Sequence, residues 1–154
     1  MVRPCDPAAM PPQSLDDPTL AFLRTVWALD HRLQSHSKQM KSEKGVTGPQ
    51  RLVLRVLELL PGTAPSELAR ILCFHRSTVT VIVRGLEAAG LVRRARNGKD
   101  GRAVVLTLTP EGRRVVADRS GTVESLFRKA LGALPPPDVA GALRVLDALA
   151  AVLE

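Results

Sequence analysis

The feature that most constrains this fold is a change of hydrophobic period close to residue 91. Before it, apolar residues recur at helical spacing in two short segments, 65–72 and 76–89, joined by a tight three-residue turn. After it, residues 91–94 and 103–109 alternate or are β-branched, and turn-forming residues separate them. The sequence therefore predicts two short helices followed by a β-hairpin with a long tip.

Helical patterns flank this central region on both sides. A long helix is expected to start at Asp16 or Asp17 and to reach about Lys41. The capping-box pattern from Thr47 to Gln50 predicts the start of a second helix, which ends before Pro61. The helix carries five apolar residues at helical spacing: Leu52, Val53, Val56, Leu57 and Leu60.

Two more helices are expected after the hairpin. Thr109-Pro110 predicts the cap and start of a helix that continues to Pro135. Asp138 predicts the cap of a final helix. The last helix carries an apolar stripe of Val139, Leu143, Leu146, Leu149 and Leu153. The apolar stripes of the terminal helices exceed what one small winged domain can cover, which indicates packing against a second copy of the chain.

The order of elements predicts a mainly α protein with a small β-wing. The expected organisation is a winged helix-turn-helix flanked by N- and C-terminal dimerisation helices. We assign residues 1–15 to a flexible tail with four prolines, 16–45 to the N-terminal dimerisation helix, 46–109 to the winged helix-turn-helix and 110–154 to the C-terminal dimerisation helices.

Positive charge is concentrated in the central region. The chain has 22 Lys and Arg against 15 Asp and Glu, a formal net charge of +7. Eight of the basic residues but only two acidic ones lie between Arg70 and Arg102. A basic patch on an otherwise balanced protein is typical of binding to a polyanion. The alternative is a solvated basic face without a partner.

The second short helix is the candidate recognition helix. An α-helix fits the major groove of DNA, and a narrow basic loop can follow the backbone towards the minor groove. Opposite the apolar residues Val79, Val83 and Leu86 lie side chains suited to base edges and phosphates: Ser77, Thr78, Thr80, Val81 and Arg84. Further expected DNA contacts are His75 (a helix cap or phosphate contact), Arg76, Arg94, Arg96, Lys99, Asp100 and Arg102.

These motifs resemble the MarR family of transcriptional regulators. The resemblance rests on Leu68-Ala69, Ser77-Thr78-Val79-Thr80, Leu86-Glu87, Gly90-Leu91-Val92, Arg94, Asp100-Gly101-Arg102 and Leu106 to Gly112. It implies that Ser77, Thr78 and Thr80 read DNA, that Arg102 enters or borders the minor groove, and that Asp100 orients the wing. It also implies a homodimer.

The chain departs from the family pattern in the turn and in the recognition helix. Cys73 stands where glycine is usual, and His75 replaces the usual Ser or Asp cap. Arg84, followed by Gly85, stands where an acidic residue is common. This arginine either removes an ion pair between helix and wing or adds a phosphate contact.

Two aromatic residues of the first helix are candidates for an effector site. The resembled family has a small-molecule pocket between the first helix and the winged domain, and Trp27 and His31 are the residues we would place there. The alternative for Trp27 is packing against the dimerisation helices.

Several classes of protein are excluded by the sequence. No apolar run is long enough to span a bilayer, and no hydrophobic segment follows the first charges, so we expect neither membrane insertion nor a secretory signal. Two cysteines fit a reducing cytoplasm, and we expect Cys73 to pack as a small buried residue rather than to sense oxidants. No metal site, cofactor or catalytic motif is evident, so an enzyme is not expected.

The sequence therefore predicts a cytoplasmic, sequence-specific regulator that binds double-stranded DNA. We expect a homodimeric repressor that recognises a pseudo-palindromic operator and is released by a small-molecule effector. The alternative is a winged-helix mediator of protein contacts, or of non-specific nucleic-acid binding, that has no operator of its own.

Overall fold

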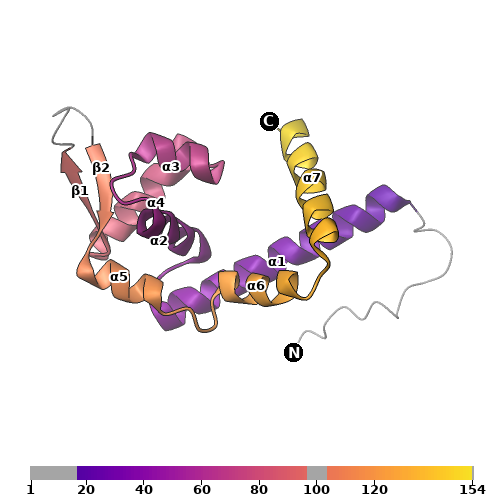
Figure 1. The fold of residues 1–154 in the computed structure, drawn as a ribbon, viewed down its shortest axis with the longest axis horizontal. Helices are drawn as coiled ribbons and strands as arrows, with labels where there is room; N and C mark the ends of the chain where they lie inside the picture. The colour runs from indigo at the N-terminus through magenta and orange to yellow at the C-terminus, as the bar shows by residue number, and fades with distance from the viewer. Residues whose placement is uncertain (1–16, 97–103, 154) are drawn as a thin grey trace. The chain divides into compact units, whose positions relative to one another are not determined.

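The computed structural model of the chain describes residues 17–96 and 104–153 (Figure 1). The chain divides into two units between Ser35 and His36. Residues 17–35 form most of a long helix, α1 (Pro18–Lys44), which starts where the carboxylate of Asp17 accepts a hydrogen bond from the backbone N–H of Thr19. It ends three residues beyond the expected Lys41, before Gly45 in the left-handed region.

The second unit holds the winged helix-turn-helix, the end of α1 and the C-terminal helices. Its further elements are α2 (Gly48–Leu59), α3 (Pro65–Leu72), α4 (Arg76–Ala88), β1 (Val92–Arg96), β2 (Val104–Leu108), α5 (Pro110–Ala117), α6 (Val123–Gly132) and α7 (Pro136–Val152). This order of short helices and hairpin confirms the fold class expected from the sequence.

The wing is an antiparallel hairpin extended by one short bridge. Val92 pairs with Leu108 at its base and Arg96 with Val104 at its described end. Thr63, between α2 and α3, adds a bridge to Leu106, which the sequence pattern did not indicate. The hairpin is therefore fixed to the helical part by its second strand.

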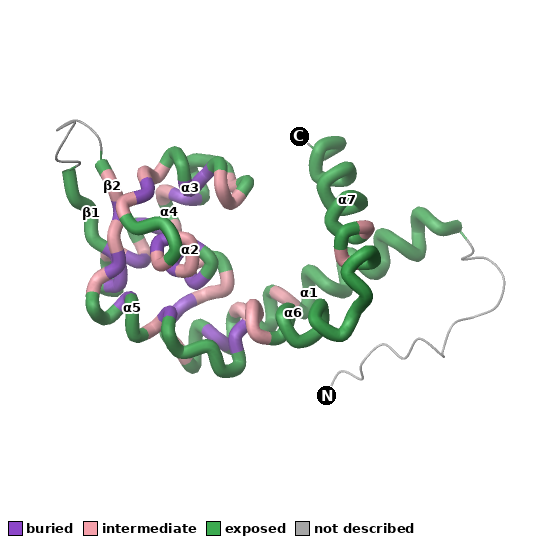
Figure 2. Tube along the Cα trace, viewed as in Figure 1, coloured by how far each residue is buried: buried purple, intermediate pink, exposed green. Residues whose placement is uncertain are grey.

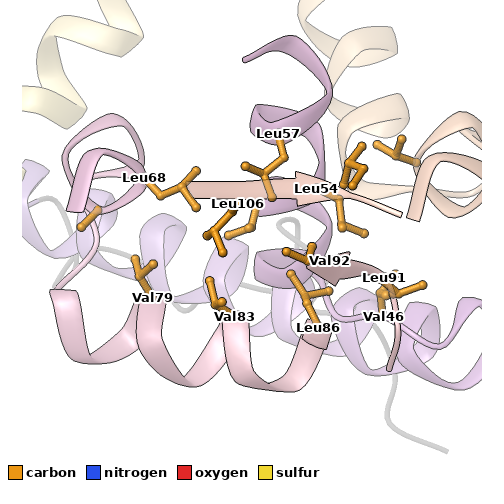
Figure 3. Packing of buried hydrophobic residues seen from close by; sticks show 14 residues of the cluster. Val46, Leu54, Leu57, Leu68, Val79, Val83, Leu86, Leu91, Val92 and Leu106 are labelled. Atoms are coloured by element: carbon orange, nitrogen blue, oxygen red, sulfur yellow. The ribbon is translucent and has the colours of Figure 1, made fainter. Parts of the chain in front are cut away.

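An apolar cluster fills the space between α2, α3, α4 and the hairpin (Figure 3). Val79, Val83 and Leu86 of α4 are fully buried in it, as expected. On α2 the sequence pattern omitted Leu54, which is buried, whereas Leu52 and Leu60 are about half exposed. Leu60 lies outside the helix as its C-cap, where the helical spacing no longer holds.

Local signals in the sequence set several of the helix ends. Thr47 and Gln50 form both hydrogen bonds of the expected capping box. Thr109 caps α5 by accepting from the N–H of Gly112. Gly112 itself is required by close packing, because a Cβ at this position would overlap the carbonyl oxygen of Leu91.

The expected single helix from Pro110 to Pro135 is wrong, because the chain forms two helices there. The carboxylate of Asp118 accepts hydrogen bonds from the N–H and hydroxyl of Ser120. Gly121 has φ +60°, and Thr122 caps α6 by accepting from the N–H of Ser125. A side-chain-stabilised turn, a left-handed glycine and a new N-cap together end one helix and start the next.

The cap of the final helix also differs from the expectation. α7 begins at Pro136 after Pro135 in the N-cap position, and no side chain caps it. Asp138 lies within the first turn, where its charge favours the helix N-terminus without capping it.

A buried arginine ties α2 to the segment that follows the wing. The side chain of Arg51 is fully buried and donates to the carbonyl oxygens of Val115 at 2.7 Å and Val116 at 3.1 Å. Its Nε forms an ion pair with Glu124 of α6. Arg51 therefore satisfies carbonyls at the end of α5 and fixes the start of α6.

The C-terminal helices leave their apolar faces open in the single chain. α6 and α7 contain no buried residue and are almost entirely exposed (Figure 2). The large exposed apolar residues here are Leu126, Phe127, Leu131, Leu143, Val145, Leu146, Leu149 and Val152.

Candidate nucleic-acid interface

The turn between α3 and α4 depends on a left-handed residue. Cys73 has φ 51° and ψ 39°, and the N–H of Phe74 donates to the carbonyl of Ala69. The expectation that Cys73 is a buried packing residue is wrong, because the structure leaves it exposed. The left-handed backbone turns this residue out of the helix, and it explains why glycine suits the position.

His75 occupies the N-cap position of α4, but its side chain does not cap the helix. The imidazole is not one of the short oxygen-bearing side chains that reach the N–H groups of the first turn. The expectation that the His75 side chain caps the helix is therefore wrong, although the residue occupies the N-cap position. The first N–H groups of α4 consequently receive no side-chain acceptor from the residues described.

The outward side of α4 carries a mixed surface of small polar, apolar and cationic groups. Ser77, Thr78 and Arg84 are exposed, and Val81 is 69% exposed. Thr80 is half-buried, and its hydroxyl donates to the carbonyl of Arg76 at 2.8 Å. The methyl group and a lone pair of Thr80 remain available to a partner, whereas its proton is already engaged.

Gly85 has a packing role that accounts for one departure from the family pattern. A Cβ at this position would lie 2.9 Å from Nε2 of Gln50. The Oε1 of the same Gln50 accepts from the N–H of Thr47 in the capping box of α2. The small residue on α4 therefore leaves room for the cap of the neighbouring helix.

Three arginines line the described part of the wing, all of them exposed. Arg93 donates from Nε to the hydroxyl of Thr107 at 3.2 Å, and Arg94 donates from Nε to the carboxylate of Glu87 at 2.7 Å. Arg96 has no ion pair with the residues described. The expected contacts Lys99, Asp100 and Arg102 lie outside the described residues.

The two effector candidates lie on the first helix. Trp27 is 65% exposed, and His31, one turn later on α1, is exposed as well. Within residues 17–96 and 104–153, no three His, Cys, Asp or Glu side chains gather in a way that could hold a metal ion. In the same ranges, no helix combines the length and apolar character needed to cross a membrane.

Comparisons with known proteins agree with this arrangement. A family model described as MarR family matches residues 44–103, the end of α1 to the wing. The HTH-type transcriptional regulator TtmR of Methylorubrum extorquens is 38% identical over 102 residues, which are 66% of this chain and 51% of that protein. This chain therefore spans about half the length of TtmR. The HTH-type transcriptional repressor Rv2887 of Mycobacterium tuberculosis is 29% identical over 134 residues, 87% of this chain and 95% of the repressor.

Solved structures share the fold over nearly the whole chain. The transcriptional regulator PcaV of Streptomyces coelicolor, solved with its natural ligand, has a TM-score of 0.70 and 27% identity and covers 94% of this chain and 100% of its own. MepR of S. aureus, solved with DNA, has a TM-score of 0.71 over 86% of this chain and 98% of its own, and its 18% identity supports the fold alone. The curated relatives are named HTH-type transcriptional regulators and repressors, the class of protein that the sequence predicted. Residues 44–103 thus match the MarR family, the family that the sequence motifs resemble, and the chain is similar over most of its length to named transcriptional regulators and repressors.

Proposed function

We propose that this chain regulates transcription by binding a pseudo-palindromic operator in double-stranded DNA as a homodimer. The observation that carries the proposal is the outward side of α4, where Ser77, Thr78, Val81 and Arg84 are exposed beside the arginine-bearing wing. The proposed organisation is the one assigned above: residues 46–109 bind DNA, and residues 16–45 and 110–154 form the dimer.

The two parts of this surface are suited to different features of DNA. Hydroxyl and methyl groups on α4 suit the edges of bases in the major groove. Arg93 and Arg96 on the described part of the wing, with Lys99 and Arg102 later in the sequence, suit the phosphates and the narrow groove, and Asp100 is proposed to orient the wing. Arg76 and His75 lie at the N-terminus of α4, where phosphate contacts are common.

Dimerisation follows from the apolar faces left open on α6 and α7. Leucines that are 40–58% exposed on α7, such as Leu143 and Leu149, would lose much of this exposure against a second copy. A two-fold axis places two recognition helices on one face of the duplex, about 10 base pairs apart.

We further propose that the regulator is a cytoplasmic repressor released by a small-molecule effector. PcaV, which shares the fold at 27% identity, was solved with its natural ligand, and Rv2887 is named a repressor. Trp27 and His31 are the proposed effector contacts, because an exposed indole and imidazole one turn apart offer stacking and hydrogen bonding together.

The test compares two DNA-contact variants over a salt series. Thr78→Ala should weaken binding to the selected duplex and leave random duplex unchanged, because base contacts discriminate by about 1–3 kcal/mol each. Arg102→Ala should weaken both duplexes and reduce the salt slope by about one unit for each phosphate that it no longer neutralises. Arg144→Ala, on α7, is the control for an arginine outside the DNA-binding surface, and once sedimentation has shown that this variant is still a dimer it should change neither quantity.

The opposite pattern would overturn the assignment. If Arg102→Ala alters sequence preference and Thr78→Ala alters only the salt slope, the roles of helix and wing are reversed. If neither variant changes binding, the surface formed by α4 and the wing is not the DNA-binding site. A parent protein that binds selected and random duplex equally favours a winged-helix mediator without an operator.

A further inference from the structure

An ion pair connects the candidate recognition helix to the wing. Glu87 lies in the last turn of α4, and Arg94 is the central residue of β1. The Nε of Arg94 is 2.7 Å from Oε1 of Glu87, and the two side chains are 43% and 27% exposed. Within residues 17–96 and 104–153, Glu87 is the acidic residue that pairs with a wing arginine.

The outer part of β1 is held by its pairing with β2, and few direct contacts hold it against α4. Only Val92 of the strand is buried, and residues 93–96 are exposed. The covalent connection between α4 and β1 is three residues long and includes Gly90 with φ +68°. Besides this connection and the attachment of β2 through Thr63, the ion pair therefore adds a direct side-chain link between α4 and β1, which restrains the direction of the wing relative to the helix.

We propose that Arg94 is a positioning residue, which holds the wing through Glu87 and does not itself contact DNA. This inference rests on the proposed function, and it removes Arg94 from the expected DNA contacts. A wing already held in one direction loses less conformational freedom when it binds a duplex. An acidic residue in a DNA-binding surface thereby increases affinity, although its charge repels phosphate.

Arg84 provides the contrast within the same helix. It is exposed on the outward side of α4 and has no ion pair with the residues described. Its guanidinium is therefore free to neutralise a phosphate. The ion pair between helix and wing is carried one turn further along, by Glu87, so Arg84 is not needed for it.

Whether removing Glu87 weakens or strengthens DNA binding distinguishes a positioning role from simple electrostatics. Glu87→Ala removes two negative charges from the dimer's DNA-binding surface, so electrostatics alone predicts tighter binding. Positioning predicts binding weaker by about three- to tenfold, the range expected when a partly exposed ion pair is removed from each protomer. Glu67→Ala, which removes an acid from α3 without touching the wing, should bind as tightly as the parent or more tightly.

The experiment measures the affinity of each variant for a selected duplex over a salt series. It includes a double-mutant cycle of Glu87 and Arg94. Arg94→Ala should weaken binding about as much as Glu87→Ala, and the double variant should be no weaker than either. Exchanging the charges with Glu87→Arg and Arg94→Glu should recover affinity to within about threefold of the parent. Arg94→Ala should retain the parent's salt slope, whereas Arg84→Ala should lower it by about two units in the dimer.

Amide hydrogen exchange in the free protein keeps the proposal testable if a variant binds poorly for another reason. Glu87→Ala should speed exchange in residues 92–96 and leave the N–H groups of α2 unchanged. Tighter binding by Glu87→Ala, or a salt slope lowered by about two units in Arg94→Ala, would overturn the proposal. Failure of the parent to prefer any duplex would instead overturn the proposed function.

Discussion

Arg51→Met should destabilise the protein strongly, although Arg51 lies far along the sequence from the residues it holds. Methionine keeps much of the aliphatic stem but removes the three bonds to Val115, Val116 and Glu124. An unsatisfied buried acceptor costs about 1–3 kcal/mol, and breaking a buried ion pair costs about 3–5 kcal/mol. Because Glu124 is 29% exposed and can regain water, we expect a loss near the lower limit, about 3 kcal/mol.

The assay is thermal and urea unfolding at one fixed protein concentration, because the stability of a dimer depends on concentration. A loss of about 3 kcal/mol should lower the Tm by about 10 °C in a chain of this size. The matched control is Arg55→Met, one turn later on α2, where the arginine forms an ion pair with Glu58 on the same helix.

Arg55 should matter little to the free energy of unfolding. Burial and the nearby positive charge of Arg119 lower the pKa of Arg55, so its positive charge is stabilised less there than in water. We expect Arg55→Met to change the free energy of unfolding by less than about 1 kcal/mol. An equal effect of the two substitutions, or a loss below about 1 kcal/mol for Arg51→Met, would refute the role given to Arg51.

Three further predictions concern other parts of the chain. Gly112→Ala should unfold the protein or cost more than about 3 kcal/mol in urea unfolding, whereas Gly132→Ala, with open space around it, should be neutral or stabilising. Cys73→Gly should raise the free energy of unfolding by about 1 kcal/mol by relieving a left-handed backbone, and a destabilised variant would contradict this. The pKa of Asp118 is lowered to about 2 by hydrogen bonds from Lys44 and Ser120. The stabilisation that Asp118 gives the folded state is therefore present above about pH 4 and lost as the pH falls towards 2. Asp118→Asn should reduce this acid-induced loss of stability, and acid titrations of the parent and the variant test it.

The fold was predictable because its main signals are local. The change of period near residue 91, the capping box at Thr47 and the glycine at position 90 each act within a few residues. The break between α5 and α6 had similar signals in Asp118, Gly121 and Thr122, but the apolar spacing across them favoured one long helix.

Other features depend on contacts that helical spacing does not reveal. An arginine inside an amphipathic helix is normally exposed, so Arg51 gave no sign that it reaches carbonyls more than sixty residues away. The pairing of Arg94 with Glu87 requires the angle between helix and wing, which no local pattern specifies. Cys73 was misplaced because its small apolar side chain favoured burial, whereas the left-handed backbone of the turn leaves it exposed.

The outward side of α4, together with the wing, is proposed to read a specific duplex. The most direct measurement selects duplexes from a random pool with the intact protein and then compares its affinity for the selected and random sequences. We predict a pseudo-palindrome with half-sites about 10 base pairs apart, centre to centre, bound at least ~10³-fold more tightly than random duplex at physiological salt. No enriched sequence, or equal affinity for selected and random duplex, would contradict the account.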